Sequence, residues 1–467
     1  MTARFYDSTP LGQIVNGIAS SEFRATGISI DTRTLQAGDL YIALQGEQQD
    51  GHQFVPQARE RGAVAALVST IQDDPLPQMV VKDTTLALGQ LAQWWRLQQS
   101  NLTVIAVTGS NGKTSVKEML RPIFATQGEV LATAGNFNNH IGLPLTLLQL
   151  QPQHRYAILE MGANHPGEIA YLAGLAKPDI AVVNNVGPAH LQGFGSIEGV
   201  AAAKAEIYQA LSAAGVAVIN ADDAFAALMR QVAAQIPARV VGFGCQAVAE
   251  VGLDTTVASS PPLLPLKTPQ GTQVVQLSLL GQHNVMNALA ASAVAVAANI
   301  GLADIKTGLE AMQAVPGRLQ LWSCQVKGRV VRVIDDTYNA NLASLTAALA
   351  VLAAFPGQKW VALGAMGELG EQGATLHQQA GQRIKASGVS QLFAVGELCR
   401  ESVAELGENG HYFVNQAELI AAIQAVLQDW PERNPDGLTL LVKGSRSMQM
   451  ERVVQAVLAI GEGTTPC

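Results

Sequence analysis

The sequence is poor in cysteine, in aromatic residues and in charge. Its 467 residues include 4 Cys, and only 5% are aromatic and 14% are charged. The cysteines are scattered without the spacing of a metal site or a disulfide framework, so we expect reduced thiols in a cytoplasmic protein. No apolar run reaches the roughly 18 residues that a transmembrane helix needs. The first residues have no apolar segment typical of a secretory signal, so we expect no membrane insertion.

Basic residues never gather in a long run. The formal net charge is −8, with 29 Lys and Arg against 37 Asp and Glu. We therefore expect no nucleic-acid partner, and anionic ligands would need locally placed cations or helix ends. Apolar residues make up 48% of the chain, which is typical of an α/β protein with large buried sheets. The length is too great for one core and predicts two to four domains.

A phosphate-binding loop is the clearest motif that is present. Residues 106–114 read Ala-Val-Thr-Gly-Ser-Asn-Gly-Lys-Thr, directly after the apolar run 102–106. The glycines allow a tight turn whose N–H groups point inward, and the following helix directs the positive end of its dipole at an anion. Lys113 would then reach the terminal phosphates, and the Thr114 hydroxyl would hold Mg²⁺. The usual first glycine is replaced by Val107, so the loop is a shortened variant; the alternative is a glycine turn followed by a chance Lys-Thr pair.

Strand and helix patterns alternate in three blocks. We predict a small N-terminal α/β domain at 1–83 and a central parallel-sheet domain with the phosphate loop at 84–315. A C-terminal doubly wound, Rossmann-like domain follows at 316–467. Prolines interrupt the alternation at 245–280, where we expect short β structure. The expected strands are 38–44, 79–81, 102–107, 156–160, 180–186, 216–220, 330–335, 360–363, 392–395 and 438–442, and a helix is expected at 58–66.

Three side chains follow the strands of the central block. Glu160 ends an apolar strand, where ligands gather in open α/β sheets, so it is a candidate Mg²⁺ ligand; the alternative is a solvated strand-end glutamate. His190 lies just past the next strand and could contact metal, water or phosphate, although a loop histidine is as often structural. From the residues alone, Lys204 is a solvent-facing lysine on an alanine-rich helix.

Asparagine clusters and a C-terminal pair of acids also suggest ligand contacts. The loop 136–139 offers amides for a ligand or for Asx turns. Asn284 and Asn287 open a helix and could both face a base, or could be an N-cap and a surface residue. Asp335 and Asp336 follow a strand, which is again a ligand position. The glycine pattern at 364–370 is a weak signal, and 443–446 could bind a carboxylate or phosphate.

Together these motifs resemble the Mur ligase family of bacterial cell-wall synthesis over nearly the whole chain. The shortened phosphate loop is this family's form. Residues 335–341 and 364–370 resemble the member that adds a dipeptide, and the Asp-Asn-Pro-Arg motif of the diaminopimelate-adding member is absent. Leu342 stands where proline is common. The segments that carry the resemblance are 108–114, 136–139, 160–162, 185–190, 204–206, 283–287, 316–318 and 335–341.

The resemblance implies an ATP-dependent ligase that works through an acyl phosphate. Its expected substrates are UDP-N-acetylmuramoyl-tripeptide and D-alanyl-D-alanine, and residues 29–33, 38–39 and 50–52 resemble the uridine-nucleotide-binding domain. The implied cofactors are ATP and two Mg²⁺. Lys204 would be carbamylated by CO₂ and would help to hold the second ion beside Glu160 and His190. A carbamate forms only on a neutral amine, so the site must lower the pKa of this lysine.

The resemblance also implies roles for single residues. The catalytic set is Lys113, Glu160, His190 and Lys204, and the metal contacts are Thr114, Glu160, His190 and carbamylated Lys204. ATP contacts are Thr108, Gly109, Ser110, Asn111, Gly112, Lys113, Thr114, Asn284, Asn287, Arg318 and Asp336. Substrate contacts are Ser29, Asp31, Arg33, Asn138, Asn139, Tyr338, Asn339, Asn341 and Lys443, with Lys443 and His377 as weaker candidates for the dipeptide.

Other functions remain as alternatives. A GTPase switch lacks support because no Asn-Lys-x-Asp guanine motif occurs. A nucleotide-binding scaffold would have no use for a complete metal-and-lysine set. A related Mur ligase that adds a single amino acid is nearer, as is a folylpolyglutamate synthase, although that enzyme begins close to its phosphate loop and here about 100 residues come first. We expect the protein to be a monomer.

Overall fold

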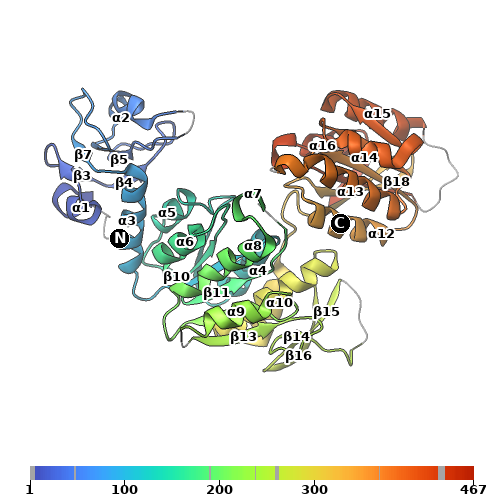
Figure 1. The fold of residues 1–467 in the computed structure, drawn as a ribbon, viewed down its shortest axis with the longest axis horizontal. Coiled ribbons are helices and arrows are strands. Elements are labelled where there is room, and N and C mark those ends of the chain that lie inside the picture. The colour runs from blue at the N-terminus through green and yellow to red at the C-terminus, as the bar shows by residue number, and fades with distance from the viewer. Residues whose placement is uncertain are drawn as a thin grey trace.

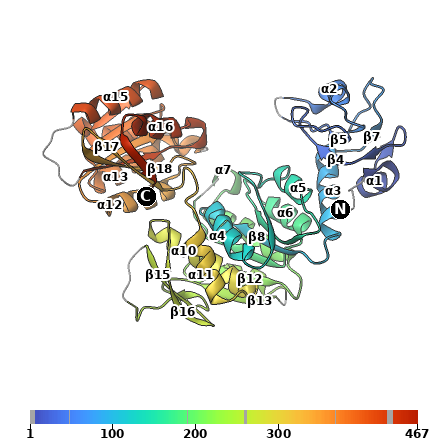
Figure 2. The same cartoon turned by 180° about the vertical axis from the view of Figure 1, so that it is seen from behind.

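The computed structural model describes residues 6–466 apart from 47–48, 189–190, 237, 258–261, 368 and 430–436. Three bodies follow one another along the chain (Figure 1). The N-terminal body (blue) and the C-terminal body (orange to red) lie on two sides of the central body (green to yellow), as the view from behind also shows (Figure 2). This confirms the mixed α/β class with parallel sheets. Within the described ranges, no helix is long and apolar enough to cross a membrane.

The N-terminal body is built on a mainly parallel sheet with the strand order β2-β7-β6-β5-β4. The predicted helix at 58–66 is wrong in its second half, because α2 ends at Glu60 and residues 65–68 form β6. Gly62, with φ +93°, turns the chain between them. Ala-Ala-Leu-Val is fully buried between β5 and β7, where a continuous apolar run makes a parallel strand. The elements are β1 (Tyr6–Asp7), α1 (Ser8–Val15), β2 (Ile18–Ala19), β3 (Arg24–Ala25), β4 (Gly27–Ser29), β5 (Asp39–Ile42), a 3₁₀ turn (Gly51–Phe54), α2 (Val55–Glu60), β6 (Ala65–Val68) and β7 (Gln78–Val80).

The central sheet is parallel throughout its described strands, in the order β13-β12-β11-β8-β10-β9. Strand β8 lies between β10 and β11, so the phosphate loop leaves the sheet beside the carboxyl ends of both neighbours. Ligands bind at such positions in open α/β sheets. The proline-rich stretch forms a small antiparallel sheet, β14-β15-β16, as predicted. The elements are α3 (Thr84–Leu97), β8 (Thr103–Thr108), α4 (Lys113–Ala125), β9 (Glu129–Ala132), α5 (Gly142–Leu147), β10 (His154–Glu160), α6 (Glu168–Ala176), β11 (Ile180–Val183), α7 (Leu191–Phe194), α8 (Ile197–Ala205), a 3₁₀ turn (Glu206–Ala210), β12 (Val216–Asn220), α9 (Ala226–Ala233), β13 (Arg239–Phe243), β14 (Gly252–Leu253), β15 (Leu263–Thr268), β16 (Gly271–Gln276), α10 (Gln282–Ala297) and α11 (Leu302–Ala311).

Helices cover both faces of the central sheet. Alternate residues of β8 enter different cores: Val104 and Ala106 pack with α3, α5, α6 and α8, whereas Ile105 and Val107 pack with α4, α10 and α11. In Figure 2 α4 and α10 lie beside each other on this second face. Burial on both faces explains why β8 is a continuous apolar run rather than an alternating one.

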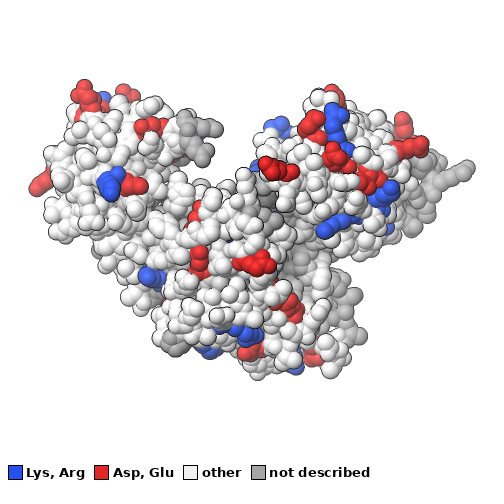
Figure 3. Space-filling view, in the orientation of Figure 1, with Lys and Arg blue, Asp and Glu red and all other residues white. Residues whose placement is uncertain are grey.

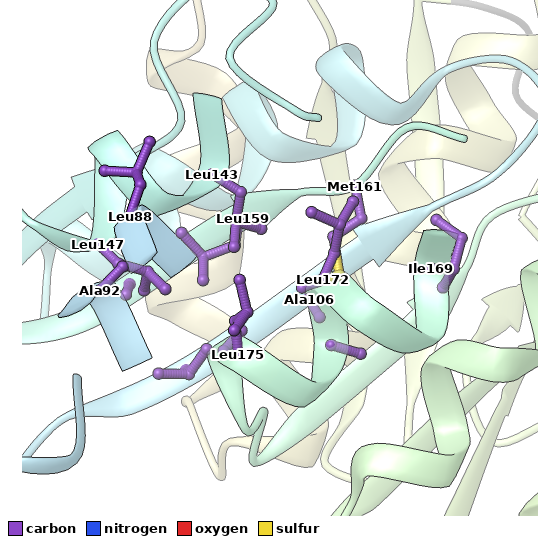
Figure 4. Close-up of a cluster of buried hydrophobic side chains, with 14 of the residues drawn as sticks. Leu88, Ala92, Ala106, Leu143, Leu147, Leu159, Met161, Ile169, Leu172 and Leu175 are labelled. Atoms are coloured by element: carbon purple, nitrogen blue, oxygen red, sulfur yellow. The ribbon is translucent and has the colours of Figure 1, made fainter. Parts of the chain in front are cut away.

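The first core also joins the N-terminal body to the central sheet. Figure 4 shows Leu88 of α3 close to Leu147 of α5, with Leu159 of β10 nearby, and all three side chains are buried. The same core includes Leu40 and Leu67 of the N-terminal sheet. The packing that holds the N-terminal body therefore also holds β10, the strand that ends at Glu160.

The C-terminal body is a second doubly wound unit. Its sheet has the order β21-β20-β19-β22-β18-β17-β23, parallel from β21 to β18, and the four strands predicted here are confirmed. The antiparallel edge made by β17 and β23 was not predicted. The elements are β17 (Gln320–Val326), β18 (Arg329–Asp336), α12 (Leu342–Ala353), β19 (Gln358–Gly364), a 3₁₀ turn (Gly370–Gln372), α13 (Gly373–Ala386), β20 (Gln391–Val395), α14 (Cys399–Leu406), a 3₁₀ turn (Gly407–Asn409), β21 (Gly410–Phe413), α15 (Gln416–Asp429), β22 (Leu438–Lys443), a 3₁₀ turn (Arg446–Met448), α16 (Glu451–Ala459) and β23 (Glu462–Pro466).

Candidate active site

The phosphate loop connects β8 to α4 as the sequence predicts. Gly112 is the N-cap of α4 and has φ +78°, which favours glycine. A Cβ atom at this position would lie 2.4 Å from Oδ1 of Asn287 and 2.6 Å from Nδ2 of Asn184. The loop therefore rests directly on these two buried amides, and no larger residue fits at position 112. The N–H groups of the first turn of α4 are left for an anion.

Residues that follow β11 also hold the phosphate loop, through hydrogen bonds. The Ser110 amide donates to the Asn185 carbonyl at 3.0 Å, and the Asn111 amide donates to Asn185 Oδ1 at 2.9 Å. The Asn185 side chain in turn donates to the Asn111 carbonyl at 2.9 Å, and the Ser110 hydroxyl donates to the Gly187 carbonyl at 2.9 Å. No role is predicted for Asn185 from the sequence, although its place directly after a central strand was the available signal.

Glu160 lies next to the phosphate loop, one strand away. Its carboxylate accepts hydrogen bonds from the Thr114 hydroxyl and from the Asn138 amide, each at 2.9 Å. Its own backbone amide donates to the Thr133 hydroxyl at 3.0 Å, which fixes the end of β10. The side chain is 3% exposed. A carboxylate and a hydroxyl side by side are the hard oxygen ligands that Mg²⁺ prefers.

Two side chains of the C-terminal body reach the phosphate loop. Arg318 Nη2 donates to the Thr114 hydroxyl at 2.9 Å, and its guanidinium lies 4.2 Å from the centre of the Tyr338 ring. Asn341 Nδ2 donates to Asn111 Oδ1 at 3.0 Å. Arg318 Nε is buried and has no hydrogen-bond partner among the described residues. The site therefore brings together groups from two bodies, and Arg318 retains an unused donor.

The site has two lysines, of which Lys204 is buried and Lys113 is half-buried, and each lies among other charges. Lys113 donates to the Gly109 carbonyl at 2.8 Å, and burial lowers its pKa, with the charge of Arg318 acting in the same direction and Glu160 opposing it. Lys204 is 2% exposed, so the solvent-facing position suggested by its helix is wrong. Its amine lies 5.7 Å from the centre of the Phe194 ring. Burial, aided by the charge of Lys113, lowers the pKa of Lys204 to about 7.

A cavity of about 1520 Å³ runs between the central and C-terminal bodies. Figure 3 shows that the molecule is hollowed between its two outer bodies, above the central one. The cavity wall joins the phosphate loop to the predicted substrate residues. Predicted residues on the wall are Ser110, Asn111, Gly112, Lys113, Thr114, Asn138, Asn139, Glu160, Arg318, Asp336, Tyr338, Asn339, Asn341 and Lys443.

Three family models match the chain. They are described as Mur ligase family, catalytic domain (residues 24–95), Mur ligase middle domain (107–295) and Mur ligase, glutamate ligase domain (317–457). The UDP-N-acetylmuramoyl-tripeptide–D-alanyl-D-alanine ligase of Escherichia coli (strain K12) is 42% identical over 454 residues, which cover 96% of this chain and 97% of that protein. The chain belongs to the Mur ligase family. The resemblance found in the sequence is thereby confirmed.

Solved structures of relatives have the same three-body fold. MurF from Acinetobacter baumannii superposes with a TM-score of 0.90 at 36% identity, covering 98% of this chain and 100% of that one. MurF ligase from Thermotoga maritima in complex with ADP gives a TM-score of 0.78 at 27% identity, covering 92% and 96%. The domain boundaries at 83/84 and 315/316 stay a prediction.

Several predicted residues lie away from the cavity wall. Asn284 is not the N-cap of α10, because Gly281 holds that position. Instead, Asn284 donates to the Leu280 carbonyl at 2.8 Å and accepts from Asn287 at 3.0 Å, while Asn287 accepts from Asn184 at 2.9 Å. These buried amides pack against the phosphate loop at Gly112. Their contact with adenine stays a prediction. Thr108, Gly109 and Lys204 are also absent from the described wall, and His190 lies outside the described residues.

The N-terminal candidates are not part of the cavity either. Ser29 ends β4, and its hydroxyl donates to the Asp31 carbonyl at 2.9 Å. Arg33 pairs with the Asp31 carboxylate at 2.6 Å, and this hydrogen-bonded pair lowers the pKa of Asp31 to about 2. The Arg33 side chain is exposed. Asn139, which does reach the cavity wall, accepts from the Gly142 amide at 2.8 Å and so also shapes the start of α5.

The two candidates for the dipeptide side have internal partners. Lys443 is 1% exposed; it pairs with the Asp336 carboxylate and donates to the Asn339 carbonyl at 2.9 Å. His377 is fully buried, accepts from the Met366 amide at 3.0 Å and bonds the Gly373 carbonyl at 2.8 Å. Both residues therefore hold the loops that line the cavity, and a direct dipeptide contact stays a prediction for each.

Loss of the Lys443 ammonium should destabilise the C-terminal body. In Lys443→Met the Asp336 carboxylate, whose side chain is only 13% exposed, keeps its charge without a partner, which costs about 3 kcal/mol of unfolding free energy. Urea unfolding followed by circular dichroism measures this change. The exposed Lys385 offers a control, since Lys385→Met should stay within about 0.5 kcal/mol of wild type. An equal effect in both variants would contradict the assignment.

Proposed function

We propose that this chain joins D-alanyl-D-alanine to UDP-N-acetylmuramoyl-tripeptide in an ATP-dependent, ADP-forming reaction. The observation that carries the proposal is the cavity in which the phosphate loop, Glu160 and side chains of the C-terminal body meet. The choice of substrates is supported by the relatives, since full-length matches from Escherichia coli and Bacillus subtilis, at 42% and 35% identity, are both named for this reaction. The solved MurF–ADP complex supports nucleotide binding at this fold.

The reaction needs an activated acid because oxide is a poor leaving group. In the first step an oxygen of the tripeptide carboxylate attacks the γ-phosphorus of ATP, and the bond from that phosphorus to ADP breaks. In the second step the amine of the dipeptide attacks the acyl carbon, loses a proton, and expels phosphate together with the attacking oxygen. Both reactants of the first step are anions, so cations at the meeting point are required. Lys113 and Arg318 supply positive charge there.

The donor set at the loop suits a divalent ion. Thr114 and Glu160 present adjacent oxygens, and Arg318 Nη2 already places a cation at the Thr114 hydroxyl. Mg²⁺ bound here would offset the repulsion between carboxylate and γ-phosphate. We propose His190 and carbamylated Lys204 for a second ion. The support for Lys204 is its burial and its pKa of about 7, which makes a neutral amine available to CO₂ near neutrality.

The C-terminal body would bring the amine and close the site. Its hydrogen bonds from Arg318 to Thr114 and from Asn341 to Asn111 connect it to the phosphate loop. Closure of this kind excludes water, which would otherwise hydrolyse the acyl phosphate. Tyr338 and Asn339 are proposed for the peptide side of the cavity, and Asp336 for the nucleotide.

The N-terminal body would hold the nucleotide-sugar end of the peptide substrate. Ser29, Asp31 and Arg33 are our candidates for this contact, because their loop follows β4 and Arg33 is exposed. The hollow between the outer bodies leaves room for an extended substrate that reaches from this loop to the cavity (Figure 3). We further propose that the protein is a cytoplasmic monomer.

A phosphate-release assay tests the proposed reaction. The protein is given ATP, Mg²⁺ and UDP-N-acetylmuramoyl-tripeptide, and D-alanyl-D-alanine is compared with D-alanine, L-lysine and diaminopimelate as acceptor. We expect phosphate release to follow the dipeptide and the product mass to increase by one dipeptide residue. Release with a single amino acid instead would assign the chain to a different ligase of the family, and intact ATP with every acceptor would reject the proposal.

Arg318 offers a smaller test of the nucleotide side. In Arg318→Lys the positive charge stays, but the flat contact with Tyr338 and the forked donor geometry are lost. We expect kcat/KM for ATP to fall about tenfold, or about 1.4 kcal/mol of transition-state stabilisation. Steady-state kinetics with varied ATP gives this number. The exposed Arg24 on the N-terminal body provides the matched control, and a similar loss in Arg24→Lys would count against the proposed role.

A further inference from the structure

The start of α6 has an unusual cap. Gly167 is the N-cap residue, with φ +86°, and has no side chain to accept a hydrogen bond. Helices leave their first amides without partners, and a capping residue normally accepts one of them while the third helical residue returns a bond to the cap. Here both bonds come from outside the helix: Glu206 Oε1 accepts from the Gly167 amide at 2.8 Å, and Oε2 accepts from the Ala170 amide at 3.0 Å.

Glu206 is two residues after Lys204, at the end of α8. Side chains two apart on a helical backbone point in different directions. Glu206 therefore turns towards α6 while Lys204 turns into the core beside Phe194. One short segment thus holds the first turn of α6 on one side and the buried lysine on the other.

The segment that Glu206 fixes belongs to the cavity wall. Asn164, Gly167 and Glu168 line the cavity, and so do Ser196 and Ile197 at the start of α8. The segment also follows Glu160 closely in the chain, because β10 ends there and α6 begins at residue 168. Movement of this segment would therefore change the wall and the relation of α8 to the end of β10.

Two further contacts hold residues 164–168 in place. Glu168 Oε2 accepts from the Asn164 amide at 2.7 Å and from the His165 amide at 3.3 Å, so the second carboxylate is used within the segment. A Cβ atom at Gly193 of α7 would lie 1.9 Å from the Asn164 carbonyl oxygen, so α7 packs directly on it. Glu206 connects the end of α8 to this segment through its two hydrogen bonds to the start of α6.

We propose that Glu206 is a positioning residue for ligation: by capping α6 from another helix, it sets α8 and Lys204 against the strand end that carries Glu160. This role rests on the proposed function. Glu206 itself does not contact the reacting groups, because both of its carboxylate oxygens are engaged by backbone amides. The nucleotide loop is built by β8, α4 and the residues after β11, so its geometry does not depend on this cap.

Glu206→Ala and Glu206→Gln test the proposal, with Glu198→Gln on the exposed side of the same helix as control. Glutamine has one amide oxygen and can accept only one of the two bonds well, whereas alanine accepts neither. We expect kcat to fall about tenfold in Glu206→Ala and less in Glu206→Gln, with KM for ATP within about twofold of wild type. Glu198→Gln should match wild type in both constants.

Hydrogen–deuterium exchange supplies a readout that is independent of activity. The amides of residues 167–170 should exchange faster in Glu206→Ala, while those of the phosphate loop should be unchanged. Unaltered exchange at 167–170, or a kcat of Glu206→Ala within twofold of wild type, would overturn the proposal. A fall in kcat explained wholly by a smaller folded fraction, measured by thermal unfolding, would overturn it too. If wild type forms no product, the proposed function fails, and exchange still decides whether the cap exists.

Discussion

Replacement of Lys204 by alanine is expected to slow ligation by about 10²- to 10³-fold, the range found when one preorganised group at a developing charge is removed. Lys204 is buried with a low pKa, beside the charge of Lys113, and a surface role would need neither property. Alanine has no amine to carbamylate, so bicarbonate should give no rescue. Product formation at saturating substrates, with and without bicarbonate, measures both effects. Nucleotide affinity should be retained, because the phosphate loop is built elsewhere.

The control for this variant is Lys267→Ala, which removes an exposed lysine from β15. It should leave turnover and nucleotide affinity at the wild-type values. Near-normal turnover of Lys204→Ala would remove this lysine from the site. Recovery of Lys204→Ala by bicarbonate would show that the effect does not pass through a carbamate.

Lys204 should also make the free energy of unfolding depend on pH in a characteristic way. The ordinary lysine pKa of 10.5 falls to about 7 on folding, mainly through burial and the Lys113 charge, with Glu206 and Glu168 opposing. Between these values the unfolded chain binds more protons, so the lysine's contribution makes the native state more stable as pH rises towards 10.5 and penalises it most below about 7. Lys204→Met should therefore gain stability relative to wild type at pH 6 and lose most of that gain by pH 10. Urea unfolding at both pH values checks this sign.

Glu160→Gln is the second change for which we expect a loss of about 10²- to 10³-fold in turnover. Glutamine keeps the volume and can still accept from the Thr114 hydroxyl, so the fold should be intact. The negative charge is lost, however, and a neutral amide oxygen is a weaker Mg²⁺ ligand than a carboxylate. The Mg²⁺ concentration needed for half-maximal rate should therefore rise together with the loss of kcat. Turnover measured as a function of Mg²⁺ concentration distinguishes weaker Mg²⁺ binding from a general structural defect.

Glu129→Gln is a suitable comparison, because Glu129 begins β9 at an exposed position on the neighbouring strand. Its Mg²⁺ dependence should equal that of wild type. A Glu160→Gln enzyme with unchanged Mg²⁺ dependence would contradict metal binding at the Thr114–Glu160 pair.

Local patterns were enough to predict the order of the domains and the position of the loop. A short apolar run such as 103–108 is typical of a strand buried on both faces, and a glycine turn followed by Lys-Thr is typical of a phosphate loop at the start of a helix. Glu160 could be placed because the end of a buried strand has a defined location in a parallel sheet. These inferences need no knowledge of residues distant in the chain.

Partners that are distant in sequence were beyond this reasoning. Lys204 sits on an alanine-rich helix, and its burial depends on Phe194 and on helices packed by other segments. Lys443 was expected to contact a substrate. Its ammonium instead pairs with the Asp336 carboxylate, which lies 107 positions away in the chain. The cap of α6 by Glu206 crosses 39 positions. Helical or strand periodicity carries no information on such pairs, and the helix predicted at 58–66 failed for the same reason.

The proposed reaction requires the tripeptide carboxylate to take the γ-phosphoryl group of ATP at the phosphate loop. Tripeptide with ¹⁸O in its terminal carboxylate tests this directly, when ligation is run to completion with D-alanyl-D-alanine and the released phosphate is analysed by mass spectrometry. We expect one ¹⁸O atom in each phosphate molecule formed from fully labelled acid. Unlabelled phosphate accompanying a normal yield of ligated product would contradict it.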